Sequence, residues 1–208
     1  MPRLVAFGCS YTYGEALPDC YDPATGRAGP HPSMFAWPKL LADKLNVECV
    51  NCGEPAFSNA AILSRILDFK FCHDDICAIL WTFKSRDILF QPSGENKNLG
   101  RWNVDWSDNL DMYDMVVKNK LHMHHAQSYL RYLNIPSYAM DADYFKRHPL
   151  DHLMPKWAKS IELINADFEA LENNGPKGLD NLHPGQEFHN EISNIMYNEI
   201  IKHQRGNT

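Results

Sequence analysis

Residues 3–8 read RLVAFG, a short apolar run that ends in glycine. Such a run is typical of a strand that is buried on both faces of a sheet and stops at a tight turn. Ser10 follows two residues after the glycine, so its hydroxyl is expected at the carboxyl edge of that sheet. Because open α/β sheets bind ligands beyond this edge, Ser10 is the first candidate for a functional side chain.

Strand-like and helix-like segments alternate along the rest of the chain. Further strands are predicted at 47–52, 76–82 and 135–140, and helices at 34–45, 58–71, 111–133, 157–171 and 185–202. Residues 18–32, rich in Pro, Gly and Asp, are expected to form a surface excursion. The alternation implies right-handed crossovers between parallel strands, and hence an α/β fold. We expect one domain over residues 1–208, built as a three-layer α/β/α sandwich with a central parallel sheet.

Residues 91–108 combine Pro, Gly and Asn with Trp102 and Trp106 and show no periodicity. Long irregular segments of this kind often cover a site, so this one is predicted to be a lid insertion. The two tryptophans either line a substrate groove or anchor the lid to the core.

Composition and charge narrow the classes of function. The formal net charge is -6, and Lys and Arg are scattered along the chain, which argues against a nucleic-acid partner. No window reaches the roughly 18 consecutive apolar residues of a membrane span. The N-terminus runs into the first strand without a cleavable signal, so a cytoplasmic location is expected. The sequence leaves the oligomeric state open.

A second group of candidate residues lies near the other end of the chain. Residues 178–185 read GLDNLHPG and place Asp180 and His183 on one loop. A serine hydroxyl needs an adjacent base, usually a histidine that a carboxylate orients. Asp180 can accept a hydrogen bond from the Nδ1–H of His183, which fixes the tautomer and leaves Nε2 facing Ser10. Ser10 alone is more typical of a helix cap, but the two motifs together favour a catalytic triad of Ser10, His183 and Asp180.

Three segments resemble blocks of the SGNH/GDSL hydrolase family. Residues 8–11, GCSY, are similar to its Gly-Asp-Ser-Leu block, and residues 180–183, DNLH, to its Asp-x-x-His block. Residues 51–59, NCGEPAFSN, resemble the second block, where a backbone N–H helps to bind the oxyanion. The matching position is Ala56, with Gly53 as a competing assignment. The resemblance implies a flavodoxin-like SGNH hydrolase fold and a serine esterase that needs no cofactor or metal. Its substrate would be a small-molecule or carbohydrate ester, with acetyl as one acyl group.

The third family block is the clearest departure. The family usually places Gly-x-Asn after the third strand, whereas residues 81–87 read WTFKSRD. Thr82, Ser85 or Arg86 is the candidate side-chain donor to the oxyanion, beside the N–H of Ser10. Loss of one such donor costs about 2.7 to 4 kcal/mol of transition-state stabilisation. The alternative is therefore a catalytically weak or inactive SGNH-fold module that binds a carbohydrate or a protein partner.

The opening GCSYT is similar to that of divergent family members, some carried by bacteria and their viruses. If a phage encodes the chain, the host cytoplasm is the expected location.

The cysteines suggest a metal site, since the close pair Cys49 and Cys52 is followed by Cys72 and Cys77, and paired thiolates can complete a tetrahedral zinc site. Cys49 and Cys52 lie three residues apart along a predicted strand, which points their side chains to opposite faces. Reduced thiols buried in the core are therefore favoured over a zinc site.

Two further polar groups have simple interpretations. His122 and His125 share a face of a predicted helix with His124 nearby, and solvated or partner-facing histidines are favoured there over a metal site. Asp141 and Asp143 follow the fourth predicted strand at the functional edge, where turn formation explains them equally well.

Overall fold

The computed structural model describes residues 1–89, 97–99, 112–143, 154–173 and 175–206. Four parallel strands form its main sheet: β1 (Arg3–Phe7), β4 (Glu48–Asn51), β5 (Ile76–Trp81) and β8 (Ser137–Asp141). Their order is β4-β1-β5-β8, so the chain crosses from one side of β1 to the other between β4 and β5. The crevice at such a reversal lies outside the carboxyl ends of β1 and β5.

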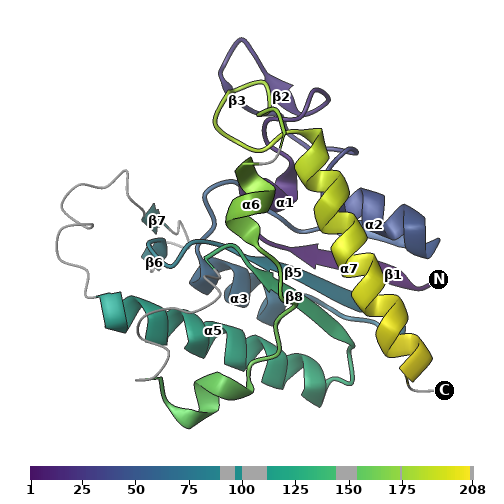
Figure 1. Ribbon diagram of the computed structural model, residues 1–208, viewed down its shortest axis with the longest axis vertical. Helices are drawn as coiled ribbons and strands as arrows, with labels where there is room; N and C mark the ends of the chain where they lie inside the picture. The colour runs from purple at the N-terminus through teal and green to yellow at the C-terminus, as the bar shows by residue number, and fades with distance from the viewer. Residues whose placement is uncertain (90–96, 100–111, 144–153, 174, 207–208) are drawn as a thin grey trace.

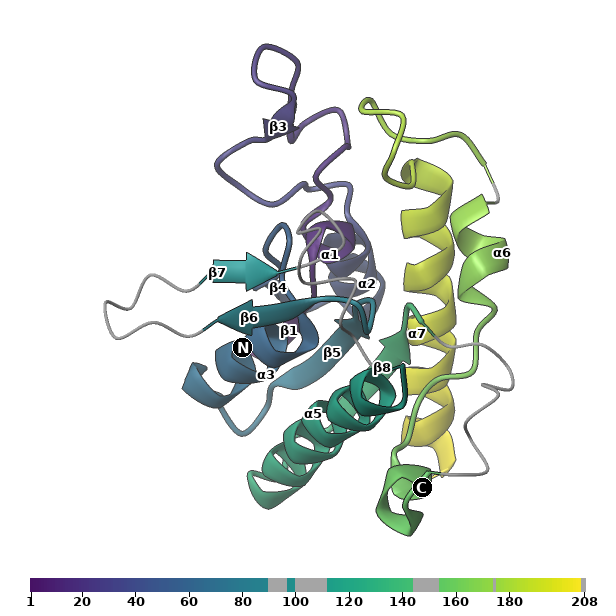
Figure 2. The same cartoon turned by 90° about the vertical axis from the view of Figure 1, so that its left-hand side faces the viewer.

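Alternate residues of β1 face two different layers of helices. Leu4 and Ala6 belong to the core beneath α2 (Trp37–Leu45) and α7 (Gln186–Gly206). Val5 and Phe7 belong to the core beneath α3 (Asn59–Asp68) and α5 (Met112–Tyr132). Figure 1 shows these helix pairs on opposite sides of the sheet, and Figure 2 shows the same layers from the side. The three-layer α/β/α sandwich predicted from the sequence is confirmed.

Local signals set the ends of the helices. The Ser58 hydroxyl caps α3 by accepting a hydrogen bond from the Ala61 N–H at 3.2 Å. Pro38 lies in the first turn of α2, where a missing N–H breaks no helical bond. Asn46 and Asn134 adopt left-handed φ angles of 54° and 56° after α2 and α5. Both helices end beside these asparagines because asparagine tolerates that conformation.

The structure corrects the prediction of one continuous helix over 157–171. That region contains the 3-10 helix η2 (Lys156–Ser160), an extended stretch, and α6 (Phe168–Asn173). In the extended stretch the Ile164 N–H donates to the Ala139 carbonyl oxygen of β8 at 2.8 Å. This bond to a neighbouring strand is incompatible with a continuous helix, and the tertiary contact overrides the helical propensity of the segment.

Two loop regions also contain strands. The predicted excursion over 18–32 carries a hairpin of β2 (Tyr21–Asp22) and β3 (Arg27–Ala28). Within the predicted lid, residues 97–99 form β7 (Lys97–Leu99), which pairs antiparallel with β6 (Asp87–Leu89). The other lid residues, including Trp102 and Trp106, lie outside the described residues, so the lid stays a prediction.

The six cysteines all lie in the described part of the chain, and each is a free thiol. Cys49 packs with the α2 and α7 core, whereas Cys52 and Cys77 pack with the α3 and α5 core. The Cys49 and Cys52 side chains thus face opposite sides, as their spacing predicts. Among the described residues, no group of three or more His, Cys, Asp or Glu side chains is placed to hold a metal ion. Within the same residues no helix combines the length and apolarity needed to cross a membrane.

Candidate active site

Ser10 is the first residue of a short helix, α1 (Ser10–Tyr13), that follows β1 directly. The Cys9 carbonyl oxygen accepts hydrogen bonds from the Thr12 and Tyr13 N–H groups at 2.9 and 3.0 Å. A Cβ atom at Gly8 would lie 2.0 Å from the Thr12 Oγ1, so only glycine fits before this turn. The turn places Ser10 at the carboxyl end of β1, where the sequence predicts it. Ser10 is 2% exposed there.

Asp180 organises the loop that carries His183. Its Oδ1 accepts hydrogen bonds from the N–H groups of Leu182 and His183 at 2.9 and 3.0 Å. Asn181 between them adopts a left-handed φ of 60°. This is the local side-chain to backbone turn that Asp favours, and it leaves Oδ2 for the imidazole.

The loop of residues 178–185, the triad loop, carries Asp180 and His183 and contacts the segment that follows α1. The Leu179 N–H donates to the Ala16 carbonyl oxygen at 2.9 Å. A Cβ atom at Gly178 would lie 2.5 Å from the Ala16 Cβ, so glycine permits the close approach of the two backbones. These contacts hold the triad loop against the segment that follows Ser10 and α1.

The three predicted triad side chains lie in hydrogen-bonded succession. His183 Nε2 is 3.0 Å from Ser10 Oγ, and His183 Nδ1 is 2.5 Å from Asp180 Oδ2. Burial favours the neutral form of Asp180, but hydrogen bonds from the His183 ring and the loop N–H groups outweigh it and lower its pKa. An ionised Asp180 that accepts a hydrogen bond from the Nδ1–H of His183 leaves Nε2 as an acceptor toward the serine hydroxyl.

Three side chains around His183 were not among the residues singled out from the sequence. The Tyr11 ring meets the imidazole edge to face, with centroids 5.5 Å apart. The Tyr11 hydroxyl donates to Glu172 Oε1 on α6 at 2.7 Å. Burial, followed by this hydrogen bond, raises the pKa of Tyr11, which keeps the phenol neutral. Glu15 Oε2 lies 3.6 Å from His183 Nε2. Proximity to Ser10 in the sequence was the available signal for Tyr11 and Glu15.

The two candidate backbone donors of residues 51–59 differ in their hydrogen bonding. The Gly53 N–H donates to Asn51 Oδ1 at 2.9 Å. The Asn51 Nδ2 in turn donates to the Thr12 carbonyl oxygen of α1 at 2.8 Å. Ala56 adopts φ 64°, the left-handed region that favours glycine. The Gly53 N–H is therefore already committed to Asn51, and Ala56 has the backbone conformation of a glycine position.

The candidate side-chain donors of residues 82–86 have different surroundings. Thr82 is fully buried, and its N–H donates to Asn59 Oδ1 on α3 at 2.8 Å. The Arg86 guanidinium lies over the Phe83 ring, 5.3 Å from its centroid, and the Phe83 ring contacts Tyr11 with centroids 5.9 Å apart. Ser85 is half-buried. Arg86 thus packs on Phe83, which in turn contacts Tyr11 beside Ser10. The Thr82 backbone is instead hydrogen-bonded to Asn59 of α3.

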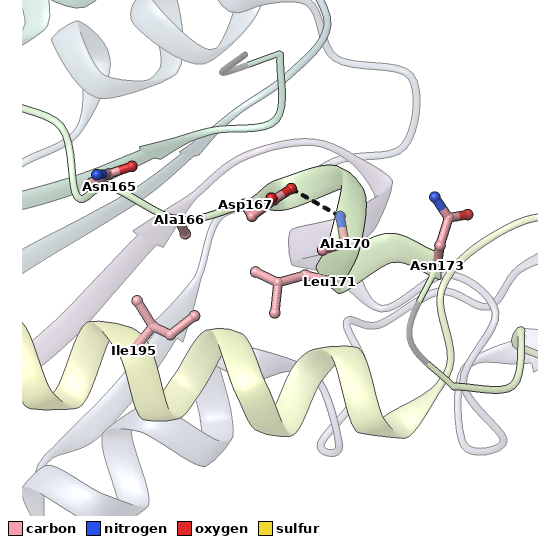
Figure 3. Close-up of a pocket in the computed structure, with 7 residues that line it drawn as sticks. All are labelled: Asn165, Ala166, Asp167, Ala170, Leu171, Asn173 and Ile195. Atoms are coloured by element: carbon pink, nitrogen blue, oxygen red, sulfur yellow. Dashed lines mark hydrogen bonds between the residues drawn. The ribbon is translucent and has the colours of Figure 1, made fainter. Parts of the chain in front are cut away.

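Two hollows border the helices around the triad loop. One, of about 460 Å³, lies between α6 and α7, and Leu171 points into it toward the α7 side chain Ile195 (Figure 3). At its rim Asp167 accepts the Ala170 N–H at 3.1 Å. A larger hollow of about 640 Å³ is lined by Phe35, by Gly178 and Leu179 of the triad loop, and by neighbouring residues. No triad residue lines either hollow.

Comparisons with known proteins bear on the fold. No protein-family model and no curated protein sequence matches this chain. A protein assigned to the lipolytic G-D-S-L family from Desulfitobacterium hafniense matches in structure with a TM-score of 0.50 and 15% identity, over 94% of this chain and 98% of that one. The psychrotrophic esterase EstA from Pseudoalteromonas sp. matches with a TM-score of 0.52 and 15% identity, over 98% of both chains.

A carbohydrate esterase shares the same architecture. The acetyl xylan esterase Est2A from Butyrivibrio proteoclasticus matches with a TM-score of 0.56 and 10% identity, over 95% of this chain and 64% of that one. The sheet order, the helical layers and these likenesses agree with one another. The chain has the SGNH/GDSL hydrolase fold.

Proposed function

We propose that this protein is a serine esterase that hydrolyses an acyl ester with Ser10 as nucleophile, His183 as general base and Asp180 as the carboxylate that orients the imidazole. The supporting observation is the pair of contacts that His183 makes, at 3.0 Å to Ser10 Oγ and at 2.5 Å to Asp180 Oδ2. Nucleophile, base and orienting group in this succession define the chemistry of acyl transfer through serine.

The reaction proceeds in two halves. His183 Nε2 takes the Ser10 proton while Ser10 Oγ attacks the ester carbonyl carbon, and a tetrahedral intermediate forms. The imidazolium then gives this proton to the leaving oxygen, and the alcohol departs from an acyl-serine. Water attacks the acyl-serine, His183 takes the water proton, and its return to Ser10 Oγ releases the carboxylic acid.

The oxyanion of each tetrahedral intermediate requires hydrogen-bond donors. We assign the backbone N–H groups of Ser10 and Ala56 to this role. Gly53 is the weaker assignment, because its N–H already donates to Asn51 Oδ1. A side-chain donor from Thr82, Ser85 or Arg86 would supplement these two groups.

The proposed substrate is an ester with a small acyl group, such as an acetyl group on a carbohydrate. The structural likeness to an acetyl xylan esterase supports this choice. The second candidate function is a noncatalytic module with the same fold that binds a carbohydrate or a protein. The absence of asparagine from residues 81–87, where the family block carries one, favours this alternative.

A fluorophosphonate probe separates the two functions. The purified protein should be labelled on Ser10, and labelling and turnover of 4-nitrophenyl acetate should both be lost in Ser10→Ala. The fall in kcat should be roughly 10⁴-fold or more. Ser160→Ala is the matched control, because Ser160 is exposed and lies on η2. A folded wild-type protein that takes no label and turns over no ester would exclude the esterase and favour the binding module.

A further inference from the structure

Glu15 places a second carboxylate on the imidazole of His183. Its Oε2 lies 3.6 Å from Nε2, the nitrogen that faces Ser10 Oγ at 3.0 Å. Asp180 occupies the opposite nitrogen, Nδ1, at 2.5 Å. The proposed proton transfers between serine, leaving group and water all pass through Nε2, so Glu15 lies beside the reacting atoms rather than behind the imidazole.

The backbone fixes this position from both sides. Gly14 adopts φ 80° at the end of α1, and a Cβ atom there would lie 2.7 Å from Ser33 Cβ and 2.8 Å from Ala36 Cβ. The Glu15 N–H donates to the Ser10 carbonyl oxygen at 3.2 Å. The next residue, Ala16, accepts the Leu179 N–H of the triad loop at 2.9 Å. Glu15 is thus held between the helix of the nucleophile and the loop of the base.

Among the described residues, the ion pair of Glu15 is with His183, and no Lys or Arg pairs with it. The nearby acid Glu54 differs, because it pairs with Arg65 at 3.8 Å. The Glu15 side chain is 20% exposed, so part of it is accessible from solvent. A negative charge therefore faces the place where Nε2 meets its proton acceptor.

In the proposed reaction the alcohol of the ester leaves on the side of His183 where Glu15 faces Nε2. In the proposed reaction the Nε2 proton goes to the leaving oxygen, so the leaving oxygen must lie within hydrogen-bond reach of Nε2. A carboxylate 3.6 Å from Nε2 then lies next to the first atoms of the alcohol. At such distances the interaction between unit charges outweighs RT even in water.

We propose that Glu15 is a specificity-determining residue that sorts the leaving alcohol by charge. Esters whose alcohol carries an ammonium group are preferred, neutral alcohols are intermediate, and anionic alcohols are rejected. The inference rests on the proposed esterase function and adds the class of alcohol that the site accepts.

The test uses three acetate esters that differ in the charge of the alcohol: acetylcholine, its neutral isostere 3,3-dimethylbutyl acetate, and 4-acetoxybutanoate. For the wild-type enzyme kcat/KM should fall in that order, with a ratio on the order of tenfold between acetylcholine and the neutral isostere. In Glu15→Gln this ratio should approach one, and in Glu15→Asp the order should persist. Added salt should compress the wild-type ratio, because screening weakens exposed charges.

The ratio is the readout, because Glu15→Gln also removes a negative charge beside the imidazolium and changes every rate. Glu191→Gln is the matched control, since it removes one charge from an exposed position of α7. It should leave the three kcat/KM values in the wild-type order. An unchanged ratio in Glu15→Gln, with ester turnover intact, overturns this inference alone. A wild-type enzyme that hydrolyses none of the esters and takes no fluorophosphonate label overturns the proposed function and this inference together.

Discussion

The side-chain nitrogen of Asn51 donates a hydrogen bond to the Thr12 carbonyl oxygen at 2.8 Å. Asn51 ends β4, and Thr12 belongs to the helix that carries Ser10. The Oδ1 of the same side chain accepts the Gly53 N–H at 2.9 Å. One carboxamide therefore links the helix that carries Ser10 to the loop that carries Ala56, the two residues whose N–H groups we propose as oxyanion donors.

Replacement of Asn51 by Asp should disturb both stability and catalysis. The carboxylate still accepts the Gly53 N–H but sets a negative oxygen against the Thr12 carbonyl. We expect a loss of about 1 to 3 kcal/mol in the free energy of unfolding, measured in urea. The kcat for 4-nitrophenyl acetate should fall because the oxyanion donors shift. Asn190→Asp, at an exposed position of α7, is the control. Reduced stability with an unchanged kcat would limit Asn51 to a structural role.

The Asp180→Asn variant should separate orientation of the imidazole from folding of the loop. The amide oxygen can still accept the N–H groups of Leu182 and His183, so the loop should fold. An amide no longer selects the tautomer in which Nδ1 carries the proton. In serine proteases the equivalent change lowers kcat by about 10⁴-fold, and a loss of similar order is expected here. A loss below tenfold, with a wild-type circular dichroism spectrum, would speak against the triad.

Ala56 provides a test of backbone strain at the proposed oxyanion donor. Its φ of 64° costs an L-residue about 1 to 2 kcal/mol. Glycine avoids this strain, but its greater conformational entropy in the unfolded state offsets part of the gain. Ala56→Gly should therefore stabilise the protein by up to ~1 kcal/mol and retain its activity, because the N–H remains. Ala56→Val should destabilise it, since branching at Cβ disfavours this region. A stability order other than Gly, Ala, Val in urea unfolding would contradict the assigned conformation.

The sequence predicts the sheet and the triad because both depend on local signals. The buried run 3–8 fixes the central strand, and the motifs around Ser10 and His183 lie on turns whose shape is set by nearby residues. The extended path of 161–167 is different, because it depends on a bond from Ile164 to Ala139 of β8. Periodicity along the chain carries no information about such a distant strand.

The residues around the His183 imidazole also depend on contacts that local sequence patterns do not reveal. Glu172 reaches Tyr11 from α6, a helix whose position depends on the extended stretch before it. Glu15 reaches His183 because the left-handed Gly14 turns the chain back after α1. Neither contact was visible from residue types and spacing. The polar groups at the centre of the site are therefore predictable from motifs, whereas the residues that modulate them require the tertiary structure.

Asp141 should make the protein less stable as the pH rises. Burial raises the pKa of Asp141 to about 6, against the opposing effect of the Lys120 ammonium at 3.8 Å. The folded state then binds more protons than the unfolded state between about pH 4 and 6. Stability from this group is complete below about pH 4 and is lost as the pH passes 6. The advantage of Asp141→Asn in unfolding free energy should thus grow by about 1 to 3 kcal/mol from pH 4 to 7.

The control for this measurement is Asp68→Asn, because Asp68 is exposed at the end of α3. Its difference from the wild type should stay nearly constant over the same pH range. A constant difference for Asp141→Asn would show that Asp141 titrates in the folded protein as it does in water.

His189 should produce the opposite dependence on pH. Burial, followed by the charge of His183, lowers the pKa of His189 to about 3, and its Nδ1 accepts the Trp37 N–H at the start of α2 at 3.2 Å. Between about pH 6.5 and 3 the unfolded chain therefore binds a proton that the folded chain does not. The stability from this neutral imidazole is complete above pH 6.5 and is lost as the pH falls. From pH 7 to 4 the wild-type protein should lose about 1 to 3 kcal/mol of unfolding free energy relative to His189→Gln.

The exposed His31, as His31→Gln, should give a curve parallel to the wild type. Parallel curves for His189→Gln as well would contradict a lowered pKa of His189 in the folded protein.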